Sequence, residues 1–156
     1  MDRHMKDIML KITGMQFIGT ESEDRMEFTT DGKLYEKNGD IYLVYYESEL
    51  SGFPGCMTTL RLGGDSVRMK RIGKQALGAE MHFEPGKRMT SKYETPYGVF
   101  DMELLTNRVE NRMQEEGVVT VDYHIALDGL VEGRNTLEIR VEPAAEDEEA
   151  GRRGNE

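Results

Sequence analysis

The chain has 156 residues, with 20 basic and 30 acidic side chains, a formal net charge of −10 at pH 7, one cysteine and no tryptophan. This length is typical of one domain that buries its own core, the acidic excess opposes binding to nucleic-acid phosphates, and no stretch approaches the about 20 apolar residues that span a bilayer. We expect one soluble domain over residues 1–142 and an acidic, disordered tail over residues 143–156.

The first half of the chain alternates apolar and polar residues with the period of two that is typical of strands. One strand is expected at residues 8–13 and another at residues 26–30. Asp31-Gly32 then predicts a turn or a bulge, and Asn38-Gly39 predicts a hairpin turn before a strand at residues 41–47.

Turn residues divide the second half into further short strands. The most informative stretch is Tyr93-Glu94-Thr95-Pro96-Tyr97-Gly98, where Pro96 predicts a sharp corner between two strands. Residues 106–116 are expected to form a strand, because the strands on both sides need pairing partners. A short helix ended by Gly117 is the alternative. The other expected strands are residues 57–62, 67–72, 81–83, 89–95, 99–105, 117–127 and 137–141.

This succession of strands with short connections predicts an all-β fold. Serial hairpins build an up-and-down antiparallel sheet, and a sheet of about eight to ten strands curls and closes to remove its exposed edges. We therefore expect a single antiparallel up-and-down β-barrel. A barrel of this size is either filled by side chains or wide enough to hold one small ligand.

The order of short motifs resembles the YwiB-like family of small bacterial proteins of unknown function. The resemblance covers most of the chain from Lys6 to Glu142 and implies a calycin-like, lipocalin-like β-barrel, with no implied activity. The matching motifs are Tyr45-Tyr46-Glu47-Ser48-Glu49, Thr58-Thr59-Leu60-Arg61-Leu62, Arg71-Ile72-Gly73, Phe83-Glu84-Pro85-Gly86, Tyr93-Glu94-Thr95-Pro96-Tyr97-Gly98 and Val121-Asp122-Tyr123.

Motifs for catalysis, cofactors and metals are missing from the sequence. It has no glycine-rich phosphate loop, no nucleophile elbow and no metal-ligand spacing, and His4, His82 and His124 are far apart in the chain. We expect no cofactor and no metal. The single cysteine, Cys56, follows a Pro-Gly loop and is expected to be exposed and oxidisable, in a reducing cytoplasm.

Polar residues on faces expected to point inward make up the candidate binding site. Glu47 has the same parity as Ile41 and Leu43, and Arg71 has the same parity as Val67 and Met69. Arg61 was assigned inward with Met57 by the same reasoning. A guanidinium group matches a carboxylate or a phosphate. The predicted ligand-binding residues are Tyr45, Glu47, Thr59, Arg61, Arg71, Tyr93 and Thr95.

Two interpretations of this set stay open. In the structural one, Glu47 pairs with Arg61 or Arg71 inside a filled barrel. In the functional one, an arginine holds a small anionic or amphipathic ligand in the barrel or at its mouth. The alternatives to ligand binding are a protein-interaction module, possible as a homodimer, and an enzyme that uses Glu47 as acid or base. No nucleic-acid or membrane partner is expected. The tyrosines that could form a ligand wall are Tyr42, Tyr45, Tyr46, Tyr93, Tyr97 and Tyr123.

Overall fold

The computed structural model describes residues 5–18, 22–47, 55–73, 80–95, 98–128 and 130–143. Within these ranges, ten strands form one antiparallel sheet, accompanied by one short helix. The elements are β1 (Lys6–Ile18), β2 (Ser22–Lys37), β3 (Asp40–Tyr46), β4 (Met57–Gly63), β5 (Ser66–Ile72), β6 (Glu80–Phe83), β7 (Arg88–Thr95), β8 (Gly98–Arg112), α1 (Met113–Glu116), β9 (Val118–Leu127) and β10 (Leu130–Pro143).

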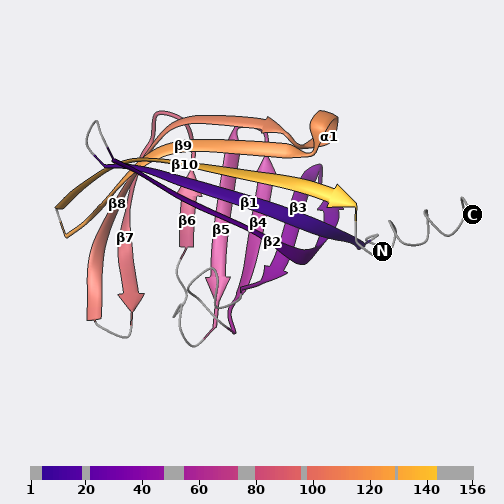
Figure 1. Ribbon diagram of the computed structural model, residues 1–156, viewed down its shortest axis with the longest axis horizontal. Helices are drawn as coiled ribbons and strands as arrows, with labels where there is room; N and C mark the ends of the chain where they lie inside the picture. The colour runs from indigo at the N-terminus through magenta and orange to yellow at the C-terminus, as the bar shows by residue number, and fades with distance from the viewer. Residues whose placement is uncertain are drawn as a thin grey trace, which may run out of the picture.

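The strand order confirms the expected up-and-down barrel. The order is β6-β5-β4-β3-β2-β1-β10-β9-β8-β7, so that all consecutive strands except β6 and β7 pair, and the first strand pairs with the last. Figure 1 shows the long strands β1, β9 and β10 running along the long axis, with β4, β5 and β6 lying across them. The barrel closes except at one seam, where β6 and β7 form no backbone ladder within the described ranges. At this seam the His82 amide donates to the Met89 sulfur at 3.2 Å.

The predicted turn at Asn38-Gly39 is confirmed, whereas the one at Asp31-Gly32 is wrong. Asn38 and Gly39 both have positive φ, 54° and 85°, as a tight hairpin turn between β2 and β3 requires. Strand β2 instead runs straight through Gly32, which pairs with Ile8 on one side and Tyr45 on the other. A Cβ on Gly32 would lie 2.8 Å from Leu10 Cδ1 and 2.9 Å from a backbone carbonyl, so the glycine allows close packing.

The segment at residues 106–116 combines both expected structures. Strand β8 continues to Arg112 and is followed by the single turn of α1. Gly117 ends this turn in the left-handed conformation, with φ of 72°, and its amide donates to the Met113 carbonyl oxygen at 3.0 Å. At the other predicted corner, β7 and β8 pair as far as Thr95 and Gly98, and Pro96 and Tyr97 lie outside the described residues.

The core fills the barrel from the inward faces of the strands. Its largest fully buried side chains include Leu10, Leu43, Leu60, Leu104 and Phe83. His124 lies exposed on the outer face, and His82 is half-buried beside Ser66, to whose hydroxyl its Nε2 lies at 3.0 Å.

The prediction of an exposed Cys56 is wrong. Cys56 is fully buried, and its carbonyl oxygen accepts a hydrogen bond from the Glu47 amide at 2.8 Å. Its sulfur lies against Gly73, where a Cβ would come within 2.7 Å of Sγ. Residues 144–156, which include most of the expected tail, lie outside the described part. Among the described residues, no helix has the length and apolar character needed to cross a bilayer.

Candidate functional site

One end of the barrel contains an open pocket of about 420 Å³. Residues of β1, β2, β3, β5, β6, β9 and β10 line it, among them the charged Asp24 and Arg25 of β2; we call it the mouth pocket. Most of its wall is apolar. The apolar lining residues are Ile12, Met15, Met26, Phe28, Met69, Met81, Phe83, Ile125 and Leu137.

A buried ion pair lies in the wall of the mouth pocket. The Glu47 side chain is 1% exposed and the Arg71 side chain 15%, and Arg71 Nε donates to Glu47 Oε2 at 3.1 Å. The hydroxyl of Thr58 donates to the same carboxylate oxygen. Strand pairing creates this contact, because Thr58 on β4 lies directly between Tyr45 on β3 and Arg71 on β5. The sheet therefore fixes the carboxylate and the guanidinium in one arrangement.

Two tyrosines extend this polar group. Burial, followed by the neighbouring charge of Glu47, raises the pKa of Tyr45, whereas the positive charge of Arg71 opposes the shift. Burial also raises the pKa of Tyr123 on β9, again against the effect of Arg71. Tyr123 packs on Phe83 with ring centroids 4.9 Å apart. Both phenols stay neutral at physiological pH and present hydroxyl groups inside the barrel.

The structure confirms the inward orientation of Tyr45, Glu47 and Arg71, but the inward orientation assigned to Arg61 and Thr59 is wrong. Thr58, Leu60 and Leu62 are the buried residues of β4, which places Thr59 and Arg61 on the outer face. The Arg61 side chain is 47% exposed, and its Nε donates to Asp40 Oδ2 at 2.8 Å. Burying two leucines is worth more than burying Met57 together with a charge, and this decides the face.

The remaining predicted residues do not line the mouth pocket in the described part of the structure. Tyr93 and Thr95 lie on β7, opposite Phe100 and Gly98, and their side chains are outside the described residues. Tyr42 lies on the outer face and stacks on Tyr35 with centroids 4.8 Å apart, and the prediction that it belongs to an interior wall is therefore wrong. Tyr46 is 70% exposed and is excluded from the interior in the same way.

Thr58 and Asn135 are polar residues of the interior that were not predicted from the sequence. Thr58 alternates with Leu60 and Leu62, and this pattern already assigns it to the inward face. Asn135 on β10 has the parity of Leu137 and Ile139 and lines the mouth pocket. In both cases the apolar neighbours two positions away were the available signal.

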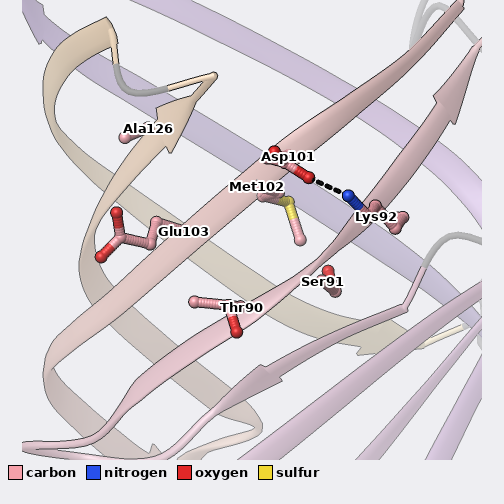
Figure 2. A pocket seen from close by; sticks show the side chains of 7 residues that line it. All are labelled: Thr90, Ser91, Lys92, Asp101, Met102, Glu103 and Ala126. Carbon is pink, nitrogen blue, oxygen red and sulfur yellow. Dashed lines mark hydrogen bonds and ion pairs between the residues drawn. The ribbon is translucent and has the colours of Figure 1, made fainter.

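A second pocket, of about 470 Å³, lies beside β7, β8 and β9. Its lining residues, drawn in Figure 2, are Thr90, Ser91, Lys92, Asp101, Met102, Glu103 and Ala126. Lys92 and Asp101 form an exposed ion pair across two strands, and Glu103 pairs with Arg88. Since these charges already have partners in solvent, this pocket is a weaker candidate than the mouth pocket. No group of three or more histidine, cysteine or acidic side chains suitable for a metal ion occurs within the described ranges.

The sequence and the fold were compared with known proteins. The family model described as "Domain of unknown function (DUF1934)" matches residues 10–139. The chain belongs to this family. Among its relatives is the "Uncharacterized beta-barrel protein YwiB" of Bacillus subtilis (strain 168), which is 25% identical over 122 residues, covering 78% of this chain and 83% of the relative.

A solved structure supports the architecture of this family member. The crystal structure of the ywiB protein from Bacillus subtilis matches with a TM-score of 0.73 and 20% identity, covering 90% of this chain and 94% of the other. The expected resemblance to the YwiB-like family is thereby confirmed. At this identity the match establishes the barrel fold, and the site has to be interpreted from its own geometry.

Proposed function

We propose that this DUF1934 protein binds a small amphipathic molecule in the mouth pocket and does not act as an enzyme. The observation that supports the proposal is an open volume of about 420 Å³ inside a barrel whose opposite walls supply apolar side chains and a few fixed polar groups. Ligand sites in proteins are typically concave, mostly apolar and about 300–1,000 Å³ in volume, with few polar groups. The proposed location is the cytoplasm.

The lining chemistry favours an amphipathic ligand over a strongly anionic one. Arg61 lies outside the barrel, whereas Arg71 and Arg25 line the pocket. Each of these two is paired with a carboxylate, Arg71 with Glu47 and Arg25 with Glu27. In our proposal Arg71 contacts a modest polar or anionic head group, Glu47 holds the guanidinium in place, and Tyr45 adds a hydroxyl group. The methionines adapt to the apolar body of the ligand, because thioether side chains are flexible and polarizable.

A thermal-shift screen tests the proposal. Small carboxylates, phosphates and amphipathic aromatic acids are added to the full chain, and we expect at least one amphipathic class to raise the melting temperature. Binding of each hit is then measured with Arg71→Lys, which keeps a cation beside Glu47, and with Arg61→Lys, the same change on the outer face. Arg71→Lys should weaken binding, and Arg61→Lys should not. The absence of any stabilising compound would overturn the proposal.

A second candidate, a protein-interaction module, has one observation in its favour. Tyr46, Met57 and Ile72 are cross-strand neighbours on the outer face, and Tyr46 and Ile72 are 70% and 47% exposed. Exposed apolar rows of this kind occur in interfaces. The mass of the protein in solution tests this candidate: a dimer that Tyr46→Ser converts to monomer would favour the interaction module.

Acid–base catalysis by Glu47 has no such support. Its Oε2 atom already accepts hydrogen bonds from Arg71 and Thr58, and its side chain is nearly closed to solvent. A substrate proton could reach only the other oxygen, Oε1, which is closed to solvent in this conformation. We therefore propose binding without turnover.

A further inference from the structure

The mouth pocket has two buried polar atoms that lack a hydrogen-bond partner. Glu47 Oε1 accepts no hydrogen bond and Asn135 Nδ2 donates none, within the described part of the chain. Both residues line this one pocket, Glu47 after the end of β3 and Asn135 on β10. In the sheet order, β2 and β1 separate these two strands. The two atoms therefore belong to different sectors of the pocket wall.

Buried polar groups of native proteins are nearly always hydrogen-bonded, so an exception calls for a physical explanation. The two exceptions here are chemically complementary, because a carboxylate oxygen is an acceptor and an amide nitrogen is a donor. Along β10, the apolar Leu137 and Ile139 follow Asn135 on the same face, and its cross-strand neighbours are Gln16 and Tyr123. An apolar residue would fill that face without leaving an unmade hydrogen bond.

We infer that the ligand of the mouth pocket carries a hydrogen-bond donor for Glu47 Oε1 and an acceptor for Asn135 Nδ2, joined by a compact, preferably aromatic body. This inference rests on the proposed binding function and specifies its ligand class. The donor is a hydroxyl or an amine, and the acceptor is a carbonyl or a carboxylate. An aromatic body suits the lining, because methionine sulfur and tyrosine or phenylalanine rings contact aromatic rings favourably.

Binding of such a molecule includes a local rearrangement. Both polar atoms are closed to solvent in the present conformation. The side chains that line the pocket include Met69 and Met81, whose flexible thioethers can move to other rotamers at low cost. The ligand then takes the space that these thioethers leave and reaches the two polar atoms. The backbone of the barrel, which is paired along β3 and β10, stays in place.

The test compares two probes that differ by one hydroxyl group. The probes are para-hydroxyphenylpropanoic acid, which has a donor and an acceptor at opposite ends, and phenylpropanoic acid, which has the acceptor alone. Isothermal titration of the full chain should show that the hydroxylated probe binds about tenfold more tightly or better, because its hydroxyl group donates to a buried carboxylate.

Two variants of the protein then show which residue contacts each end of the probe. In Glu47→Gln, Thr58 and Arg71 still require an acceptor, so the side-chain amide nitrogen takes the position of Oε1. The advantage of the hydroxylated probe should then shrink, because a neutral hydrogen bond from the amide to the phenol replaces the charge-assisted one. In Asn135→Leu, both probes should lose affinity about tenfold while their ratio is kept. Asn107→Leu, the same change at an exposed outer position, is the control and should leave both affinities unchanged.

The outcomes separate this inference from the proposed function. Binding of library compounds with no advantage for the hydroxylated probe, or with no loss in Asn135→Leu, would overturn the inference and leave the binding function intact. Failure of every compound to bind would overturn both. Because the probe ratio is measured within each variant, a change in stability alone does not produce the expected result.

Discussion

Replacing Arg71 with methionine isolates the contribution of the buried ion pair. Methionine keeps the length and apolar character of the arginine stem, but it leaves Glu47 with a side chain that is 1% exposed and without its charged partner. Removing one member of a buried pair typically costs about 3–5 kcal/mol. The stability of a domain of this kind is about 5–15 kcal/mol, so about a fifth or more of it should be lost. At about 2–4 °C per kcal/mol, the melting temperature should fall by about 10 °C.

Urea unfolding followed by circular dichroism measures this loss, with two comparison variants. Arg61→Met removes an arginine from an exposed pair with Asp40 and should cost at most about 1 kcal/mol. Combining Glu47→Leu with Arg71→Met removes both buried charges and should restore stability to within about 1–2 kcal/mol of the wild type. If Arg71→Met costs no more than Arg61→Met, the ion pair does not stabilise the interior and our interpretation is refuted.

Three further predictions concern packing, thiol reactivity and pH. Gly32→Ala should destabilise the fold by about 1–3 kcal/mol in urea unfolding, because the new Cβ would meet Leu10 Cδ1 at 2.8 Å. The control Gly14→Ala, whose nearest atom lies at 4.0 Å, should be nearly neutral. Equal losses of stability in the two variants would contradict the packing argument. Cys56 should react with a thiol reagent only after unfolding, since it is fully buried, and rapid labelling of the native protein would be inconsistent with this fold. The hydrogen bond from the Arg134 guanidinium lowers the pKa of Asp122 from its ordinary value of 3.8. The Asp122 carboxylate therefore stabilises the fold above pH 3.8, and this contribution is lost as the pH falls through the lower pKa of the folded state. Asp122→Asn should therefore cost about 1 kcal/mol at neutral pH, and the difference from the wild type should shrink in acid; a constant difference would show that the charge is not involved.

The barrel itself was predictable from the sequence because its strands alternate clearly. In β9, Val119 and Val121 are buried while His124 is exposed, as the period of two requires. The continuation of β2 through Asp31-Gly32 was not predictable from the dipeptide, which is typical of turns. Tertiary packing decides there, since Leu10 and the Val44 carbonyl approach too closely for any other residue.

The site was predictable only as far as the assigned face of each strand was right. For β3 and β5, two core residues on one parity fixed the inward positions of Glu47 and Arg71. Strand β4 has Met57 on one face and two leucines on the other. Assigning the face of Met57 to the interior placed Thr59 and Arg61 on the wrong side of the sheet. The volume of the mouth pocket depends on how side chains from seven strands meet, which no local pattern encodes.

The pairing of β1 with β10 has a consequence for how the polypeptide is made. Ile8 faces Pro143 and Phe17 faces Arg134, so the earliest of the ten described strands to be synthesised is completed by the latest. Until then its edge is open to other nascent chains, and contacts of such long sequence separation form slowly. Joining the end of β10 to the start of β1 with a short linker, and opening the chain between β6 and β7, would give a circularly permuted protein in which this ladder forms early.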